Sequence, residues 1–104
     1  MGEVMAVMNI VRAALKPGFE EEFLKIHRER ELEGFDGVRF MRLVKTGERE
    51  FIFVGEWESM DALVAARPAM IASLDKTRHM LEDLGGGLGV TDPRSGEVVI
   101  EKRP

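Results

Sequence analysis

The segment from Phe51 to Leu63, FIFVGEWESMDAL, limits the possible folds more than any other part of the chain. Its first four residues form an apolar run of β-branched and aromatic side chains, which predicts a strand with two apolar faces. Ser59, a residue type that caps helices, follows Trp57 and predicts a helix directly after this strand. Because both strand faces need cover, we expect helices on one side of the sheet and, most economically, a second copy of the chain on the other.

The N-terminal run from Val4 to Leu15, VMAVMNIVRAAL, predicts the first strand, which Lys16-Pro17-Gly18 ends. Side chains alternate across a strand, so one face carries Met5, Val7, Asn9, Val11 and Ala13 and the other Val4, Ala6, Met8, Ile10 and Arg12. Asn9 is the one polar side chain within the first face. A buried position for Asn9 would require a hydrogen-bond partner.

A helix is predicted after Pro17, because proline suits a first helical turn and the three glutamates that begin at Glu20 favour the positive end of the helix dipole. Apolar residues recur at helical spacing, and Gly34 predicts the end of the helix. His27 falls at the edge of the apolar face. The charged stretch from Arg28 to Glu33 is interpreted as a solvated helix surface.

Two strand runs, VRFMRLVK and EFIFVGEW, flank Gly47-Glu48 and predict a hairpin. A two-residue turn would pair Arg42 with Phe53 and Val38 with Trp57. One face would then carry Val38, Phe40, Arg42, Val44, Phe51, Phe53 and Trp57, and the other Met41, Leu43, Ile52, Val54 and Glu56. This grouping depends on the turn length, because a shift of one residue moves every side chain to the opposite face.

In the C-terminal half, Pro68 predicts either a kinked helix or two helices, and the apolar spacing from Ala69 onward predicts a helix that ends at Gly85-Gly86-Gly87. Turn formers fill residues 91–96, and EVVIEK predicts the last strand. The order βαββαβ predicts an α+β, ferredoxin-like fold, in which a four-stranded antiparallel sheet carries both helices on one face. The apolar residues on its open face favour a homodimer.

Length and composition restrict the class of protein. The chain has 104 residues, which suits a single domain over 1–104, and 44% hydrophobic with 33% charged residues is typical of a globular protein. A net charge of -4 argues against nucleic acid as a partner. Cysteine is absent, and the first residues fit neither a signal peptide nor a membrane span, so we expect a cytoplasmic protein with no membrane partner.

The sequence signals for a metal site, a phosphate-binding loop or a serine nucleophile are weak or absent. His79 lies opposite the apolar stripe of its helix, so we expect it to be exposed. The chain has two histidines, on different predicted helices and without HxxxH spacing, so we expect no metal site. The glycine run that starts at Gly85 follows a helix instead of preceding one, which favours an exit loop over a phosphate cradle. No GxSxG motif is present.

Asn9 and Trp57 remain, each a hydrogen-bonding side chain on an otherwise apolar strand face, with His27, Arg42 and Phe53 as candidate neighbours. In one interpretation Asn9 satisfies a backbone group and Trp57 fills the core. In the other they belong to a ligand pocket between the sheet and the helices, because small-molecule sites are apolar cavities with a few convergent polar groups.

Three segments, KPGFEEEF, GFDGVRFMRL and FVGEWESMDAL, resemble the antibiotic biosynthesis monooxygenase (ABM) family of the dimeric α+β barrel superfamily, over about four fifths of the chain. The resemblance implies a ferredoxin-like protomer whose sheet pairs with that of a second copy in a closed dimer. For some members it also implies oxidation of aromatic or quinol compounds by molecular oxygen without metal, flavin or other cofactor. In that mechanism the substrate anion itself reacts with oxygen.

A related branch, the haem-degrading monooxygenases, uses an asparagine on the first strand, a tryptophan that ends the third strand and a histidine on the next helix. Asn9 and Trp57 match the first two, but Arg67 stands where the histidine is expected. Our first hypothesis is therefore a cofactor-independent monooxygenase in which Asn9 binds an oxyanion, Trp57 packs on the substrate ring, and His27, Arg42 and Phe53 contact the substrate. The alternative is a non-catalytic dimer that binds a small molecule.

Overall fold

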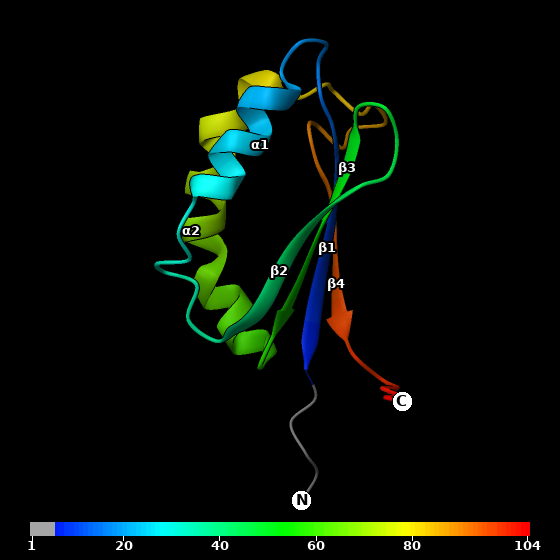
Figure 1. Cartoon of the computed structure of the whole chain (residues 1–104). Helices are drawn as coiled ribbons and strands as arrows, with labels where there is room; N and C mark the ends of the chain where they lie inside the picture. The colour runs from blue at the N-terminus through cyan, green and yellow to red at the C-terminus, as the bar shows by residue number, and fades with distance from the viewer. Residues whose placement is uncertain (1–5) are drawn as a thin grey trace, which may run out of the picture.

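The computed structural model describes residues 6–104, which form a four-stranded antiparallel sheet with the strand order β2-β3-β1-β4. The elements are β1 (Val7–Ala14), α1 (Glu20–Glu29), β2 (Val38–Lys45), β3 (Glu50–Trp57), α2 (Met60–Thr77), the 3-10 helix η1 (Arg78–Met80) and β4 (Asp92–Glu97). Both α-helices lie on the same side of the sheet (Figure 1). The predicted ferredoxin-like α+β fold is confirmed.

The alternating faces predicted for β1 are also confirmed over the described residues, whereas Val4 and Met5 lie outside them. Val7, Asn9 and Ala13 are buried on the helix side, and Ile10 on the opposite face is 45% exposed. The buried side chains form two clusters along the sheet. One contains Ala13, Leu15, Phe23, Phe51, Met80 and Leu81, and the other contains Val7, Phe35, Trp57, Leu63 and Ala66.

The predicted hairpin register is wrong by one residue over most of its length. Arg42 pairs with Val54, and Leu43 pairs with Phe53, although Val38 does lie opposite Trp57 as predicted. Arg42 is therefore on the outer face of the sheet, away from the helices. The inner face of β2 instead carries Met41 and Leu43, which were predicted to lie on the face opposite Phe53 and Trp57.

Two local features cause this shift. The backbone N–H of Thr46 donates to the carbonyl oxygen of Glu50 at 2.9 Å, so the turn contains three residues, 47–49, instead of two. A bulge between Val38 and Phe40 then restores the pairing at the other end of the hairpin. An extra residue in the turn and an extra residue in the bulge cancel, which explains why one predicted pair is correct and the others are not.

Helix α1 ends earlier than Gly34 predicted. Its last residue is Glu29, and Arg30 already has an extended backbone, with φ -68° and ψ 131°. Arg28 is exposed as expected, but Arg30 is half-buried and turns toward the sheet. The interpretation of the whole stretch as solvated helix surface is therefore wrong for Arg30.

Helix α2 is one continuous helix with Pro68 inside it, so the alternative of two helices is wrong. The predicted cap is confirmed, because the Ser59 hydroxyl accepts a hydrogen bond from the backbone N–H of Ala62 at 3.1 Å. The helix stops at Thr77, before the glycines, and η1 follows it. Leu81 is then drawn into a bridge with Leu15, which ends the helical path.

The last strand forms from residues that the sequence assigned to a turn. β4 covers Asp92–Glu97 and pairs with β1, whereas Val99 and Ile100 lie beyond it and are 78% and 74% exposed. Pro93 fits because β4 is an edge strand, where a missing backbone donor does not interrupt a second ladder. The predicted strand EVVIEK, which begins at Glu97, therefore starts where the observed strand ends.

Candidate functional site

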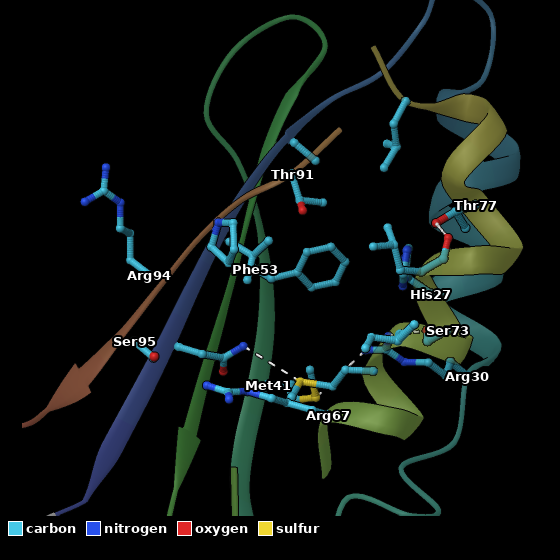
Figure 2. Close-up of a pocket in the computed structure, with 18 of the residues that line it drawn as sticks. His27, Arg30, Met41, Phe53, Arg67, Ser73, Thr77, Thr91, Arg94 and Ser95 are labelled. Atoms are coloured by element: carbon cyan, nitrogen blue, oxygen red, sulfur yellow. Dashed lines mark hydrogen bonds between the residues drawn. The ribbon is translucent and has the colours of Figure 1, made fainter. Parts of the chain in front are cut away.

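A cavity of about 460 Å³ lies between the inner face of the sheet and the two helices. Its volume is within the range of about 300–1,000 Å³ that is usual for small-molecule sites. Figure 2 shows Phe53 extending from the sheet, and His27, Ser73 and Thr77 extending toward it from the helices. Most of the wall is apolar, and the polar side chains that reach it are Asn9, His27, Arg30, Arg67, Ser73, Thr77, Thr91, Arg94 and Ser95.

Asn9 and Trp57 are joined directly. The indole Nε1–H of Trp57 donates to Asn9 Oδ1 at 2.8 Å, and this bond is buried. Since an indole N–H can only donate, it fixes the orientation of the Asn9 amide, whose oxygen must face Trp57. The Nδ2 group is left as the donor on the other side, where Met70 Sδ, a weak acceptor, lies 4.0 Å away.

The two residues have different relations to the cavity. Asn9 lines it and is 8% exposed, whereas Trp57 is 0% exposed and belongs to the core cluster behind the wall. The pocket hypothesis required both side chains on one face and a cavity that reaches at least one of them, and the structure meets both conditions. Trp57 orients Asn9, but its ring offers no surface on which a substrate could pack.

Gly55 provides the space for this hydrogen bond. It pairs with Asn9 across β1 and β3, and a Cβ atom at this position would lie 2.5 Å from Asn9 Oδ1 and 3.2 Å from Trp57 Nε1. A glycine inside a strand often marks a close approach of another group. That signal was available in FVGEW, and sequence reasoning missed it.

His27 lines the cavity as a neutral aromatic side chain. Its ring packs edge-on against Phe23 and Phe53, with centroid distances of 4.5 Å and 4.8 Å. Both ring nitrogens are buried, and neither has a hydrogen-bond partner among the described residues. Burial, with a smaller contribution from the charge of Arg30, lowers the His27 pKa from 6.5 to about 4. The imidazole is therefore uncharged at pH 7.

Arg30 is the half-buried cation of the site, and sequence reasoning did not identify it. Its Nη1 donates to Ser73 Oγ at 2.8 Å, and its Nη2 lies 3.8 Å from Met41 Sδ. The guanidinium carbon is 5.4 Å from the centre of the Phe35 ring and 5.8 Å from that of Phe53, within the range of cation–π contact. Burial lowers the pKa of Arg30, but an arginine remains protonated at any physiological pH.

The remaining candidates lie outside this arrangement. Arg42, predicted to contact the substrate, is exposed, and its guanidinium carbon packs 4.8 Å from the centre of the Phe40 ring. It lines a separate, smaller hollow of about 220 Å³ beside β2, whose walls also include His27, Arg30, Met41 and Phe53. His79 is exposed as expected, whereas Arg67 lines the main cavity from α2. Of the five predicted site residues, Asn9, His27 and Phe53 thus share the cavity, Trp57 supports it and Arg42 does not belong to it.

Among residues 6–104, no three histidine, aspartate or glutamate side chains lie close enough together to hold a metal ion. No helix in that range is long and apolar enough to cross a membrane. The cavity thus combines apolar walls, one amide donor, one neutral imidazole and one half-buried guanidinium, which suits the binding of an aromatic molecule with polar substituents.

Comparison with solved structures shows the same fold in other proteins. A protein of unknown function from Nitrosomonas europaea is 17% identical with a TM-score of 0.76, and the match covers 99% of this chain and 98% of that one. A conserved protein from Methanosarcina mazei is 12% identical with a TM-score of 0.74, over 89% and 92% of the two chains. SnoaB from Streptomyces nogalater, a cofactor-independent oxygenase, is 12% identical with a TM-score of 0.67, over 94% and 97%.

At these identities the similarity establishes the fold and leaves the activity open. No curated protein matches the chain. The family model described as antibiotic biosynthesis monooxygenase matches residues 4–68, a segment that includes Asn9, His27, Arg30 and the strand that carries Gly55 and Trp57. The chain belongs to the antibiotic biosynthesis monooxygenase family.

Proposed function

We propose that this protein is a cofactor-independent monooxygenase that oxidises a small aromatic or quinol compound with molecular oxygen. The observation that carries the proposal is the Asn9 amide, whose N–H donors are turned toward an apolar cavity by the Trp57 hydrogen bond. Family membership and the shared fold of SnoaB, a cofactor-independent oxygenase, support the same reaction class.

The reaction requires no external reductant. A quinol and O₂ give a hydroxyquinone and water, so that one oxygen atom forms a bond to a ring carbon and the other leaves as water after the O–O bond breaks. All four electrons that reduce O₂ come from the quinol, and the two hydrogens that it loses overall end in the water that is formed. The ionised quinol is the form that donates electrons readily, and Asn9 Nδ2 would stabilise its oxyanion by a hydrogen bond in the apolar cavity.

His27 is not the base in this proposal. With a pKa of about 4, its imidazole is too weak to remove a proton from a phenol, whose pKa lies about 6 units higher. Stabilisation of the anion by Asn9 must therefore supply most of the rate enhancement. Removal of the proton by solvent is consistent with the partly open cavity. Trp57 acts as a positioning residue for Asn9, in place of the ring-packing role expected from the sequence.

Oxygen uptake with 1,4-dihydroxynaphthalene and chelator-treated protein tests the proposal. We expect turnover above the uncatalysed rate, and Asn9→Ala should reduce kcat by about 10²–10³, as removal of one oxyanion donor does in other enzymes. Trp57→Phe keeps most of the ring volume and removes the N–H, so it should lower kcat less than Asn9→Ala does. Uptake that equals the protein-free rate, together with tight quinol binding, would instead support the alternative of a non-catalytic small-molecule-binding dimer.

We also propose that the protein is a homodimer formed through the outer face of the sheet. That face carries apolar residues on the three adjacent strands β2, β3 and β1, including Val44, Ile52, Val54, Met8 and Ile10. Val44 and Ile10 are 44% and 45% exposed. A continuous exposed apolar surface of this kind often marks an interface. Light scattering at micromolar concentration should give twice the chain mass, and a single-chain mass would contradict the proposal.

A further inference from the structure

The charge on the cavity wall differs from that of the chain as a whole. The sequence has 19 acidic and 15 basic residues, yet within the described part of the chain no aspartate or glutamate lines the cavity, whereas three arginines do. Charged groups of one sign along a concave, partly apolar wall attract ligands of the opposite sign. The cavity therefore favours an anion over a cation or a neutral molecule.

The three arginines are not equivalent. Arg94 lies 3.5 Å from Asp92, its side chain is 80% exposed, and in Figure 2 it extends from β4 away from the cavity. Arg67 lines the cavity from α2, but it is exposed, so water solvates its charge. Arg30 is half-buried, and no carboxylate lies within 4.0 Å of its nitrogens among residues 6–104. Arg67 has no carboxylate within 4.0 Å among these residues either, so what distinguishes Arg30 is that its charge is half-buried and lacks both a carboxylate and full solvation.

Arg30 is also held in a defined position. Ser73 accepts a hydrogen bond from it on the helix side, and the rings of Phe35 and Phe53 limit its movement. A guanidinium has five N–H donors, of which one bonds Ser73 and one faces the Met41 thioether at 3.8 Å, a weak acceptor. Its Nε is buried without a partner in the described structure. A half-buried charge with unused donors costs free energy that an incoming anion would recover.

Asn9 shows the same pattern. Its Nδ2 group also faces a methionine sulfur, that of Met70, at 4.0 Å. Methionine side chains are flexible and adapt to different neighbours. A ligand with oxygen atoms near both ends could move the two thioethers aside and give Asn9 and Arg30 stronger acceptors.

We propose that the ligand of this cavity is a small aromatic carboxylate, whose carboxylate Arg30 binds through paired N–H···O bonds while Ser73 holds the guanidinium in place. This inference deepens the proposed function, because it specifies which class of quinol the enzyme would accept, but the binding it describes does not require catalysis. Carboxylates match the planar fork of arginine, and such charge-assisted bonds are roughly twice as strong as neutral ones.

The binding test compares two probes that differ only in charge. Calorimetric titration with 2-naphthoate and 2-naphthamide changes the charge and keeps the ring and shape, and we expect naphthoate to bind at least about tenfold more tightly. Arg30→Gln should remove this preference, and Ser73→Ala should reduce it. Arg28→Gln is the matched control, because it removes an exposed arginine two residues away and should leave the preference unchanged.

Arg30→Lys is a second variant that is informative if Arg30→Gln does not fold. It keeps the positive charge but loses the paired hydrogen-bond geometry, so its preference for naphthoate should be intermediate. Thermal melts of each variant show which of them are folded. Equal affinities of the wild-type protein for naphthoate and naphthamide would overturn the inference, as would an unchanged preference in folded Arg30→Gln.

Turnover separates this inference from the proposed function. Oxygen uptake is compared for 1,4-dihydroxy-2-naphthoic acid and 1,4-dihydroxynaphthalene, which differ by the carboxylate. If both inferences hold, the acid has the higher kcat/KM, and Arg30→Gln lowers it for the acid alone. If the protein binds naphthoate more tightly than naphthamide but consumes no oxygen with either quinol, the anion site is supported and the monooxygenase activity is refuted. Equal oxygen uptake with both quinols, together with equal affinities for naphthoate and naphthamide, would support the monooxygenase and refute the anion site.

Discussion

The buried imidazole of His27 gives a quantitative prediction about stability and pH. Its folded pKa of about 4 lies below the unfolded value of 6.5, because burial and the nearby charge of Arg30 both disfavour the imidazolium. Protons therefore bind the unfolded chain more readily than the folded one. The contribution of His27 to stability is fully present above pH 6.5 and is lost as the pH falls toward 4.

The magnitude follows from these two pKa values. Between about pH 7.5 and about pH 5, the unfolded chain takes up nearly one proton at His27 that the folded chain does not, which corresponds to a loss of about 2 kcal/mol. The ring borders a partly open cavity, so solvent screening reduces the expected loss to about 1–2 kcal/mol. For a domain of this size that is a fall in Tm of roughly 4–16 °C from His27 alone.

Urea unfolding at the two pH values measures this contribution when His27→Leu is compared with the wild-type protein. The substitution keeps an apolar side chain between Phe23 and Phe53 and removes the titrating group. We expect His27→Leu to lose about 1–2 kcal/mol less stability on acidification than the wild-type protein does. His79→Gln is the control, because His79 is exposed, and its response to pH should follow the wild-type protein.

Arg30→Gln provides an independent check, since it removes one of the two causes of the lowered pKa of His27. Its stability should fall less between the two pH values than that of the wild-type protein, but more than that of His27→Leu. If the wild-type protein and His27→Leu lose equal stability on acidification, His27 is not a buried neutral side chain in solution. The assignment of His27 to the cavity wall would then be refuted.

Three further predictions concern the packing around Asn9, the cap of α2 and the binding of haem. Gly55→Ala should lower the free energy of unfolding by about 1–3 kcal/mol, measured in urea, because the new Cβ atom displaces Asn9 and leaves buried polar groups unpaired; an unchanged stability would contradict this. Ser59→Ala should cost about 1 kcal/mol through loss of the helix cap, with unchanged oxygen uptake. We expect that haem does not bind specifically, since Arg67 occupies the position of the iron-ligating histidine in the haem-degrading branch. A Soret shift at one haem per chain that His79→Ala abolishes would contradict this and show that His79 binds the iron.

The parts of the fold that could be predicted from sequence are those set by short-range patterns. The alternation in β1 places Asn9 inward because strand periodicity acts over two residues, and Ser59 caps α2 through a bond that spans three residues. The order of elements followed from such signals, and the order limited the topology to one familiar arrangement. The ends of elements were less predictable, because contacts such as that between Leu81 and Leu15 decide where a helix stops.

Arg42 shows why the predicted strand face of a candidate residue was wrong. Its face depended on the hairpin register, and the register depended on a three-residue turn and a bulge that the sequence did not reveal. Because strand periodicity is two, a shift of one residue exchanged the faces completely. The same shift brought Met41 to the inner face, where its sulfur now contacts Arg30.

Arg30 and Arg28 show the opposite case, in which two similar residues have different environments. Both follow the apolar stripe of α1, and local charge patterning gives no reason to separate them. The difference arises because the helix ends at Glu29 and the following segment must place Phe35 against Trp57, with a ring-centroid distance of 6.0 Å. That path turns Arg30 inward over Phe35, so the cation of the cavity is a consequence of core packing. Asn9 could be identified from sequence because a polar side chain at an inward strand position needs a partner wherever the fold places it. Arg30 becomes a candidate only when the structure shows that it is half-buried and that no carboxylate among residues 6–104 lies within 4.0 Å of it.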